Sequence, residues 1–184
     1  MRPDQQTKLN NTIQRLVRLD PSLTRLGLGS NGVENLLQIL SETENEEVRS
    51  EGARAIVNIA ASPAGQAIFA TEETRNTLLQ ILSETENEEV RSEGARAIAN
   101  IAYDSPAGQA IFATEETRNT LLQILSETEN EEVRRQGAAA IASIAASPAG
   151  QAIFATEETR NTLLQILSET ENEEVRSEGA RAIA

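Results

Sequence analysis

The 184-residue sequence contains no cysteine, no histidine and no tryptophan. Without cysteine, the chain has neither disulfides nor thiolate ligands for a metal ion. Without histidine, it lacks the side chain that most often serves as a general base near neutral pH. These absences predict a protein that is not an enzyme and that uses no cofactor and no bound metal.

Basic side chains are also scarce. The chain has 16 Lys and Arg residues against 29 Asp and Glu residues, for a net charge of -13. Nucleic-acid backbones and anionic membranes attract basic surfaces, so neither is expected as a partner. No apolar run approaches the roughly 20 residues that span a bilayer, and no signal-peptide pattern opens the chain. We therefore expect a soluble, cytoplasmic protein.

One motif is repeated along the chain. Leu-Leu-Gln-Ile-Leu begins at Leu36, Leu78, Leu121 and Leu163, with spacings of 42, 43 and 42 residues. Repeats of this length indicate a solenoid, in which neighbouring units bury a shared core. The additional residue of the longer unit falls in residues 102–106. We expect a loop there, because one extra residue inside a helix would rotate every later side chain by about 100°.

Each unit contains three helix-start signals. Ser62-Pro63 is typical of an N-cap followed by proline in the first turn. Thr71 begins a second helix, whose first acidic residues suit the positive end of the helix dipole. Thr85 to Glu88 is typical of a capping box with threonine as the cap. The sequence therefore predicts a short, a medium and a long helix per unit.

The third, long helix contains the segment from Asn45 to Ala60, which recurs from Asn87, Asn130 and Asn172. Glycine at position 52 costs about 1 kcal/mol relative to alanine inside a helix, yet it returns in every unit, so we expect a close helix crossing there. The apolar spacing predicts an inward face, and a polar set is expected to face outward. The inward set is Val48, Gly52, Ala55, Ile56 and Ile59, and the outward set is Ser50, Glu51, Arg54 and Asn58.

Residues 21–184 resemble the armadillo repeat. The resemblance rests on the period, on the short-medium-long helix order and on Gly-Ala-Arg-Ala-Ile-Val-Asn-Ile-Ala at residues 52–60. A HEAT repeat has a similar period but usually two helices. The resemblance implies an all-α, right-handed α-solenoid of three-helix repeats. Two features depart from the family: residues 67–71 lack the usual glycine, and arginine replaces the tryptophan of many peptide-binding members.

The resemblance also implies that the third helices line a concave groove for an extended peptide or a protein. The family's asparagine, which bonds the ligand backbone, corresponds to Asn58 and Asn100, with serine in the third unit. The alternation of arginine and glutamate favours a peptide of mixed or acidic character over a lysine-rich one. The candidate groove residues are Glu51, Arg54, Asn58, Glu93, Arg96, Asn100, Arg135, Gln136, Ala139, Ser143, Glu178 and Arg181.

The third unit differs from the second at four polar positions of this helix, which fall within an arc of about 100°. Equally polar stretches elsewhere are unchanged. Either one binding face was altered, or this unit descends from a different parent repeat. Ser92, Glu93, Arg96 and Asn100 are replaced by Arg135, Gln136, Ala139 and Ser143.

Arg54 has two interpretations. Its planar donor fork suits a partner's carboxylate. Alternatively, Glu51 and Asn58 lie one helical turn away and would hold it locally. The paired glutamates at Glu46-Glu47 and Glu72-Glu73 lie at predicted helix starts, where capping and the helix dipole explain them without a calcium ion.

We divide the single continuous domain into residues 1–35, 36–77, 78–120, 121–162 and 163–184. The first part contains an amphipathic N-terminal cap helix and a divergent first short helix, with Gly27–Gly32 as a helix–helix corner. The last part is a partial, uncapped repeat.

The units are nearly identical, since the first and third differ at five of 42 positions. This similarity suggests recent tandem duplication or laboratory design. One alternative function is therefore a structural repeat module without a natural ligand, which self-associates through its uncapped C-terminal end. A small-GTPase regulator is a further alternative, supported by the fold alone.

Overall fold

The computed structural model describes residues 3–20 and 31–183, and within these ranges it contains twelve α-helices and no strand. The predicted all-α repeat solenoid is confirmed. The helices are α1 (Pro3–Leu19), α2 (Gly32–Glu42), α3 (Glu46–Ala60), α4 (Pro63–Phe69), α5 (Glu72–Glu84), α6 (Glu88–Ala102), α7 (Pro106–Phe112), α8 (Glu115–Glu127), α9 (Glu131–Ala145), α10 (Pro148–Phe154), α11 (Glu157–Glu169) and α12 (Glu173–Ile183).

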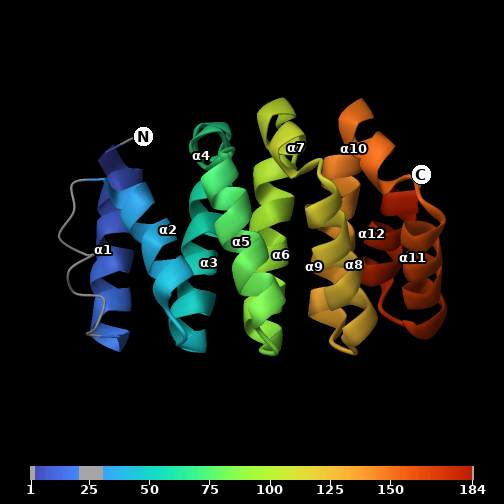
Figure 1. Ribbon diagram of the computed structural model, residues 1–184, viewed down its shortest axis with the longest axis horizontal. Coiled ribbons are helices and arrows are strands. Elements are labelled where there is room, and N and C mark those ends of the chain that lie inside the picture. The colour runs from blue at the N-terminus through green and yellow to red at the C-terminus, as the bar shows by residue number, and fades with distance from the viewer. Residues whose placement is uncertain (1–2, 21–30, 184) are drawn as a thin grey trace.

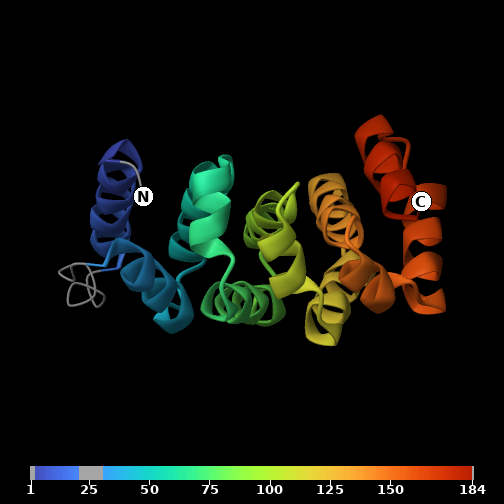
Figure 2. The same cartoon turned by 90° about the horizontal axis from the view of Figure 1, so that it is seen from above.

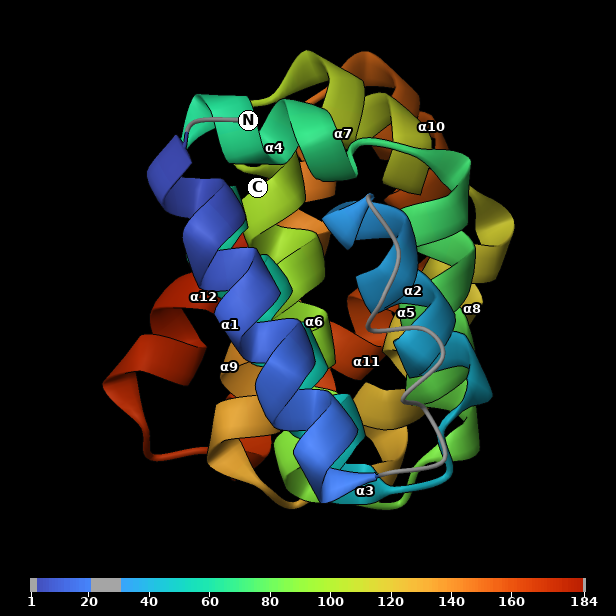
Figure 3. The same cartoon turned by 90° about the vertical axis from the view of Figure 1, so that its left-hand side faces the viewer.

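The units follow one another along the long axis of the molecule, from α1 at one end to α12 at the other (Figures 1 and 2). Seen along that axis, the long helices lie on one face, the medium helices lie on the opposite face, and the short helices lie along one edge (Figure 3). We call the surface formed by α3, α6, α9 and α12 the third-helix face.

Two of the predicted helix starts are confirmed. The Ser62 hydroxyl accepts a hydrogen bond from the Gly65 amide at 3.2 Å, and proline follows in the first turn of α4. The Thr71 hydroxyl accepts from the Thr74 amide at 3.2 Å and caps α5. The short and medium helices therefore begin where the sequence predicted.

The predicted capping box is wrong. Asn87 is the N-cap of α6, because its side-chain oxygen accepts from the amides of Glu89 and Val90 at 2.9 and 3.2 Å. Thr85 ends α5 instead, and its hydroxyl accepts from the Asn87 amide at 3.0 Å. Asparagine and threonine are both common cap residues, and here asparagine accepts the bonds from the first helix amides.

The inward set of the third helix is confirmed, since all five of its residues in α3 are buried. A methyl group added at Gly52 would lie 2.5 Å from Leu40 Cδ2. The predicted close crossing therefore lies between α3 and α2 of the same unit. Gly94 and Leu82 repeat this arrangement in the next unit.

A second glycine position makes a closer approach. A methyl group at Gly108 in α7 would lie 2.0 Å from the carbonyl oxygen of Ile101, a backbone atom that cannot rotate away. We expect Gly108→Ala to lower the free energy of unfolding by about 1–3 kcal/mol. Thermal unfolding checks this, since each kcal/mol shifts Tm by about 2–4 °C in a chain of this size.

Gly137→Ala is the matched control. Its new methyl group meets Leu125 Cδ2, the end of a flexible side chain, and alanine favours the helix by about 1 kcal/mol. An equal loss of Tm in the two variants would contradict the account of Gly108.

The predicted loop at residues 102–106 is confirmed. Helix α6 ends at Ala102, and α7 begins at Pro106. Asp104 adopts a left-handed conformation with a φ of 49°, which aspartate tolerates better than most residues. Tyr103 is 61% exposed.

The N-terminal cap helix is present as α1, which packs on α2 and α3. Leu9, Ile13 and Leu16 are buried, as the amphipathic pattern indicated. The divergent short helix and most of the expected Gly27–Gly32 corner lie in residues 21–30, outside the described residues.

Candidate functional site

All twelve candidate groove residues lie on α3, α6, α9 and α12, which pack side by side. Their exposure differs widely, because each third helix covers part of its neighbour. Asn58, Arg96 and Arg181 are exposed; Glu51, Arg54, Asn100, Arg135, Ala139 and Glu178 are half-buried; Glu93, Gln136 and Ser143 are buried.

The prediction that Ser50 faces outward is wrong. Its residue surface is 4% exposed, and Ser92, the equivalent residue in α6, is also buried. Both serines are among the buried residues of helices that pack against the neighbouring third helices. The periodicity of one helix could not show this contact, because the contact depends on the neighbouring unit.

Arg54 joins two third helices. Its guanidinium donates to Glu93 at 3.0 Å, to Glu89 at 2.6 Å and to Glu51 at 3.1 Å. These carboxylates raise the pKa of Arg54, and the hydrogen bond to Glu93 contributes most. The predicted local pair with Glu51 is confirmed, but two of the three carboxylates belong to α6.

The third unit replaces this network with a different one. Arg135 donates to Glu132 at 2.6 and 3.0 Å and pairs with Glu174 of α12 at 3.3 Å. Gln136 also donates to Glu132 at 2.8 Å. The carboxylate equivalent to Glu89 is therefore already engaged within its own helix.

Arg96 consequently differs from Arg54. In the described part of the chain, no hydrogen bond or ion pair engages its guanidinium, which interacts with Glu132 only through longer-range electrostatics. Arg96 is exposed near the middle of the third-helix face. Arg96 is therefore a free cation, whereas Arg54, Arg135 and Arg181 on the same face are paired with glutamates.

The hydrogen bonds of Glu132 are expected to make the stability of the fold depend on pH. The hydrogen bond from Arg135 is the main cause that lowers the pKa of Glu132 below its ordinary value of about 4.5. A depressed carboxyl pKa stabilises the fold above the unfolded pKa, and this contribution disappears as pH falls through the folded pKa. We expect Glu132→Gln to cost under about 1 kcal/mol at neutral pH, because the group is half-exposed, and nothing in strong acid.

Chemical denaturation of both proteins across the acid range measures this difference. An Arg135→Ala background is the control, because Glu132 there lacks its main partner and Glu132→Gln should cost less. A difference that does not depend on pH would contradict the assignment.

The family's asparagine position, which holds Asn58, Asn100 and Ser143 here, also links neighbouring units. Asn100 Nδ2 donates to the Val57 carbonyl of α3 at 3.1 Å. In the third unit, the hydroxyl of Ser143 accepts from Arg181 of α12 at 3.2 Å. Asn58 is exposed. The Oδ1 atom of Asn100 accepts no hydrogen bond in the described residues, so Asn100 retains an acceptor for a ligand.

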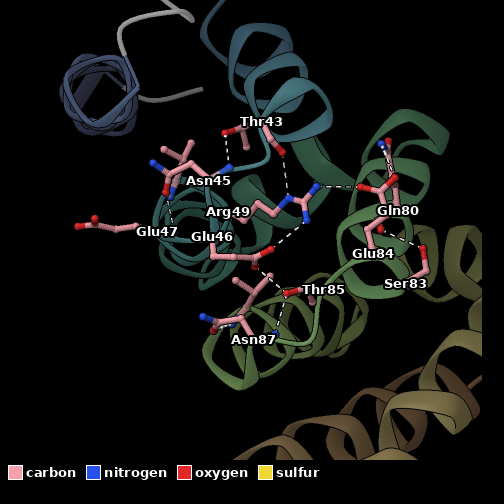
Figure 4. Close-up of polar contacts among 12 residues, drawn as sticks. Thr43, Asn45, Glu46, Glu47, Arg49, Gln80, Ser83, Glu84, Thr85 and Asn87 are labelled. Atoms are coloured by element: carbon pink, nitrogen blue, oxygen red, sulfur yellow. Dashed lines mark hydrogen bonds and ion pairs between the residues drawn. The ribbon is translucent and has the colours of Figure 1, made fainter.

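A structural arginine that the sequence analysis did not single out joins the units on the other side of the third helix (Figure 4). Arg49 donates to the Thr43 carbonyl at 3.0 Å, to Glu46 at 3.2 Å and to Glu84 of the next unit at 2.8 Å. The Thr85 hydroxyl in turn donates to Glu46 at 2.6 Å. Arginine at the position of Arg49 is present in every unit, and this repetition was the sequence signal that could have identified it.

The next two units repeat this linkage. Arg91 donates to the Thr85 carbonyl at 3.2 Å and to Glu127 at 2.9 Å. Arg134 likewise reaches Glu169 at 2.9 Å. We call this series, Arg49, Arg91 and Arg134, the inter-unit arginines.

Two kinds of site are not found in the described residues. Across residues 3–20 and 31–183, no group of three or more acidic side chains is arranged to hold a metal ion. Over the same ranges, no helix has the length and apolar character needed to cross a membrane.

Comparison with known proteins finds other helical repeat proteins. A protein-family profile described as HEAT repeats matches residues 33–114. A solved designed armadillo repeat protein, in complex with the peptide (KR)4, superposes with a TM-score of 0.67 at 24% identity, covering 95% of this chain and 80% of that chain. The chain is therefore similar to HEAT and armadillo repeat proteins.

Two further solved structures resemble this chain. One is described as computationally designed armadillo repeat proteins for modular peptide recognition, with a TM-score of 0.65, 25% identity and coverage of 95% of this chain and 80% of that chain. The other is an engineered protein with a TM-score of 0.69 and 29% identity. That match covers 83% of this chain and 61% of the engineered protein, so this chain spans less than two thirds of its length. No curated protein matches the sequence.

Proposed function

We propose that the chain is a non-enzymatic protein-binding scaffold, whose third helices form a concave groove for an extended peptide or protein segment. The observation that carries this proposal is the free Arg96 cation, beside the open acceptor of Asn100, on a face where neighbouring charges are paired. Unpaired, exposed donors and acceptors on rigid helices are suited to recognition, because binding them costs little reorganisation.

The similar solved structures support the proposal. One of them holds a peptide, and another was designed for modular peptide recognition. The bound peptide of the first is basic, whereas the free charge on the third-helix face of this chain is an arginine. We therefore propose a peptide of mixed or acidic character rather than a lysine- and arginine-rich one.

Capture from a peptide library tests the proposal, with wild type and the double variant Arg96→Ala/Asn100→Ala compared side by side. We expect the double variant to bind selected peptides at least about tenfold more weakly, because it loses a charged donor and an amide. Equal affinity for both proteins would contradict the proposal.

Two controls keep this test specific. Arg118→Ala removes the same charge from α8, a helix that lies on the opposite side of the solenoid (Figure 3), and should leave binding unchanged. Asn100→Ala breaks the bond to the Val57 carbonyl and costs about 1 kcal/mol of stability. The single variant Arg96→Ala separates the loss of binding from this loss of stability.

Self-association is a second candidate function, favoured by one observation. Leu164 is 45% exposed, whereas its equivalents Leu79 and Leu122 are 3% and 4% exposed beneath the next unit. Exposed leucine on α11, together with Ile183 at 39%, offers an apolar surface to a second copy. Light scattering over a concentration series tests this, and a strict monomer at high concentration would contradict it.

A further inference from the structure

We propose that α6 carries the specificity-determining strip of the groove, formed by Arg96, Asn100 and Tyr103. The strip fits an extended peptide segment with one carboxylate and, about 10 Å away, one apolar or aromatic side chain. This inference rests on the proposed function and names the chemistry of its ligand.

The three residues share one side of α6. They stand at i, i+4 and i+7, which at 100° per residue places them within an arc of about 60°. The Tyr103 amide donates to the Ala99 carbonyl at 2.9 Å, so the helical pattern continues to this residue. Arg96 is exposed, Asn100 is half-buried, and Tyr103 is 61% exposed.

Only α6 among the complete third helices has this combination. The single-residue insertion places tyrosine at the end of α6, where the neighbouring helices have alanine. The substitutions of the third unit remove both the arginine and the asparagine from α9. The equivalent residues are Arg54, Asn58 and Ala61 after α3, and Ala139, Ser143 and Ala146 after α9.

The free guanidinium of Arg96 follows from the same substitutions. Arg54 donates to Glu89 and Glu93 of the following unit. For Arg96, the residue equivalent to Glu93 is Gln136, which carries no charge. The residue equivalent to Glu89 is Glu132, which already accepts hydrogen bonds from Arg135. Its donor fork therefore remains open for a ligand, and a carboxylate matches that fork in charge and geometry.

Asn100 lies between the two ends of the strip. Its amide nitrogen donates to Val57, which fixes the orientation of the side chain. The remaining oxygen can accept a backbone N–H from a peptide that lies along α6. Such a bond would position the peptide backbone, while Arg96 and Tyr103 contact its side chains.

Tyr103 supplies the apolar end. It borders a cavity of about 1250 Å³, which Ser143 and Arg181 of the third-helix face line together with residues of α10 and α11. Ala142 and Ala146 give this cavity an apolar wall. An exposed aromatic ring beside an apolar wall can take up a side chain from the partner.

The surrounding charge limits the ligand to a single carboxylate. The chain has a net charge of -13, and Glu89 and Glu132 on the flanking turns are exposed. A peptide with several acidic residues would therefore be repelled. The segment that fits best has one acidic residue, an apolar or aromatic residue about three positions away, and neutral residues elsewhere.

Titration with short fluorescent peptides of this composition tests the inference. One peptide set keeps the acidic and apolar residues, a second replaces the acid with glutamine, and a third replaces the apolar residue with alanine. For the first set, we expect Arg96→Ala and Tyr103→Ala each to weaken binding by at least about tenfold. Arg96→Ala should not affect the glutamine set, and Tyr103→Ala should not affect the alanine set.

The controls separate this inference from the proposed function. Both residues are exposed, so an unchanged melting temperature shows that the variants fold, and Arg118→Ala is the charge-matched control on α8. Peptides that bind the third helices with affinity independent of both residues would overturn the strip and leave the scaffold function standing. If no library peptide binds wild type, both proposals are overturned.

Discussion

Replacing Phe112 with alanine is expected to lower the free energy of unfolding by about 3–5 kcal/mol. Phe112 ends the short helix α7 and has no exposed surface. Helix α7 contacts α6 and α9 of two successive units, so the lost ring would leave a cavity at their junction. The total stability of a typical domain is only about 5–15 kcal/mol, so this loss is large.

Urea denaturation followed by circular dichroism measures the change. Tyr103→Ala is the matched control, since it also removes an aromatic ring, but from a residue that is 61% exposed. Exposed substitutions of this kind change stability by about 0.5 kcal/mol or less. Similar losses in the two variants would mean that α7 does not pack as described.

The second large effect is expected for an inter-unit arginine. We expect Arg91→Ala to lower the free energy of unfolding by about 1–3 kcal/mol, because it leaves the buried carbonyl of Thr85 without a donor. The substitution also removes the ion pair to Glu127, which contributes less because that carboxylate is 44% exposed. Thermal and urea unfolding measure the loss.

The last unit offers a control for this prediction. Arg176 occupies the same position and donates to the Thr170 carbonyl at 3.1 Å, but it is exposed and makes no ion pair within the described residues. Arg176→Ala should therefore cost less than Arg91→Ala. The reverse order would show that the inter-unit arginines do not hold the units together.

The sequence predicted the fold well because the fold depends on local signals that repeat. Ser62 and Thr71 cap their helices as expected, and Tyr103-Asp104, the segment with the one additional residue, lies between α6 and α7. The third helix start was assigned to Thr85 rather than Asn87. Both residues are good caps, and only the geometry of the short connection after α5 distinguishes them.

The site was harder to predict, because its contacts cross between units. Ser50 was assigned to the outward, polar side of its own helix, yet it is only 4% exposed in the packed solenoid. A local pair was one of two interpretations of Arg54. The side chain bonds Glu51 locally, and it also reaches Glu89 and Glu93, which are more than 30 residues away in the chain. Such pairs depend on how adjacent helices cross, which one sequence does not specify.

The unchanged polar stretches also have a structural explanation. Glu84 and Thr85 bond to the preceding unit through Arg49 and Glu46. Their identity in every unit therefore reflects packing between units, and it is not by itself evidence that the altered positions form a binding face. The stronger argument is that the altered positions exchange one ion network for another and leave Arg96 free.

The central claim is that a peptide occupies the third-helix face, and photo-crosslinking tests it most directly. A library-selected peptide carrying a photoreactive side chain is irradiated in complex with the chain, and mass spectrometry locates the linked residues. Helix α9 differs from α3 at five positions, whereas α3 and α6 differ only at Val57 and Ala99, so a fragment must include that position to separate these two helices. We predict crosslinks to these helices, centred on α6, and crosslinks confined to α2, α5, α8 and α11 would contradict the account.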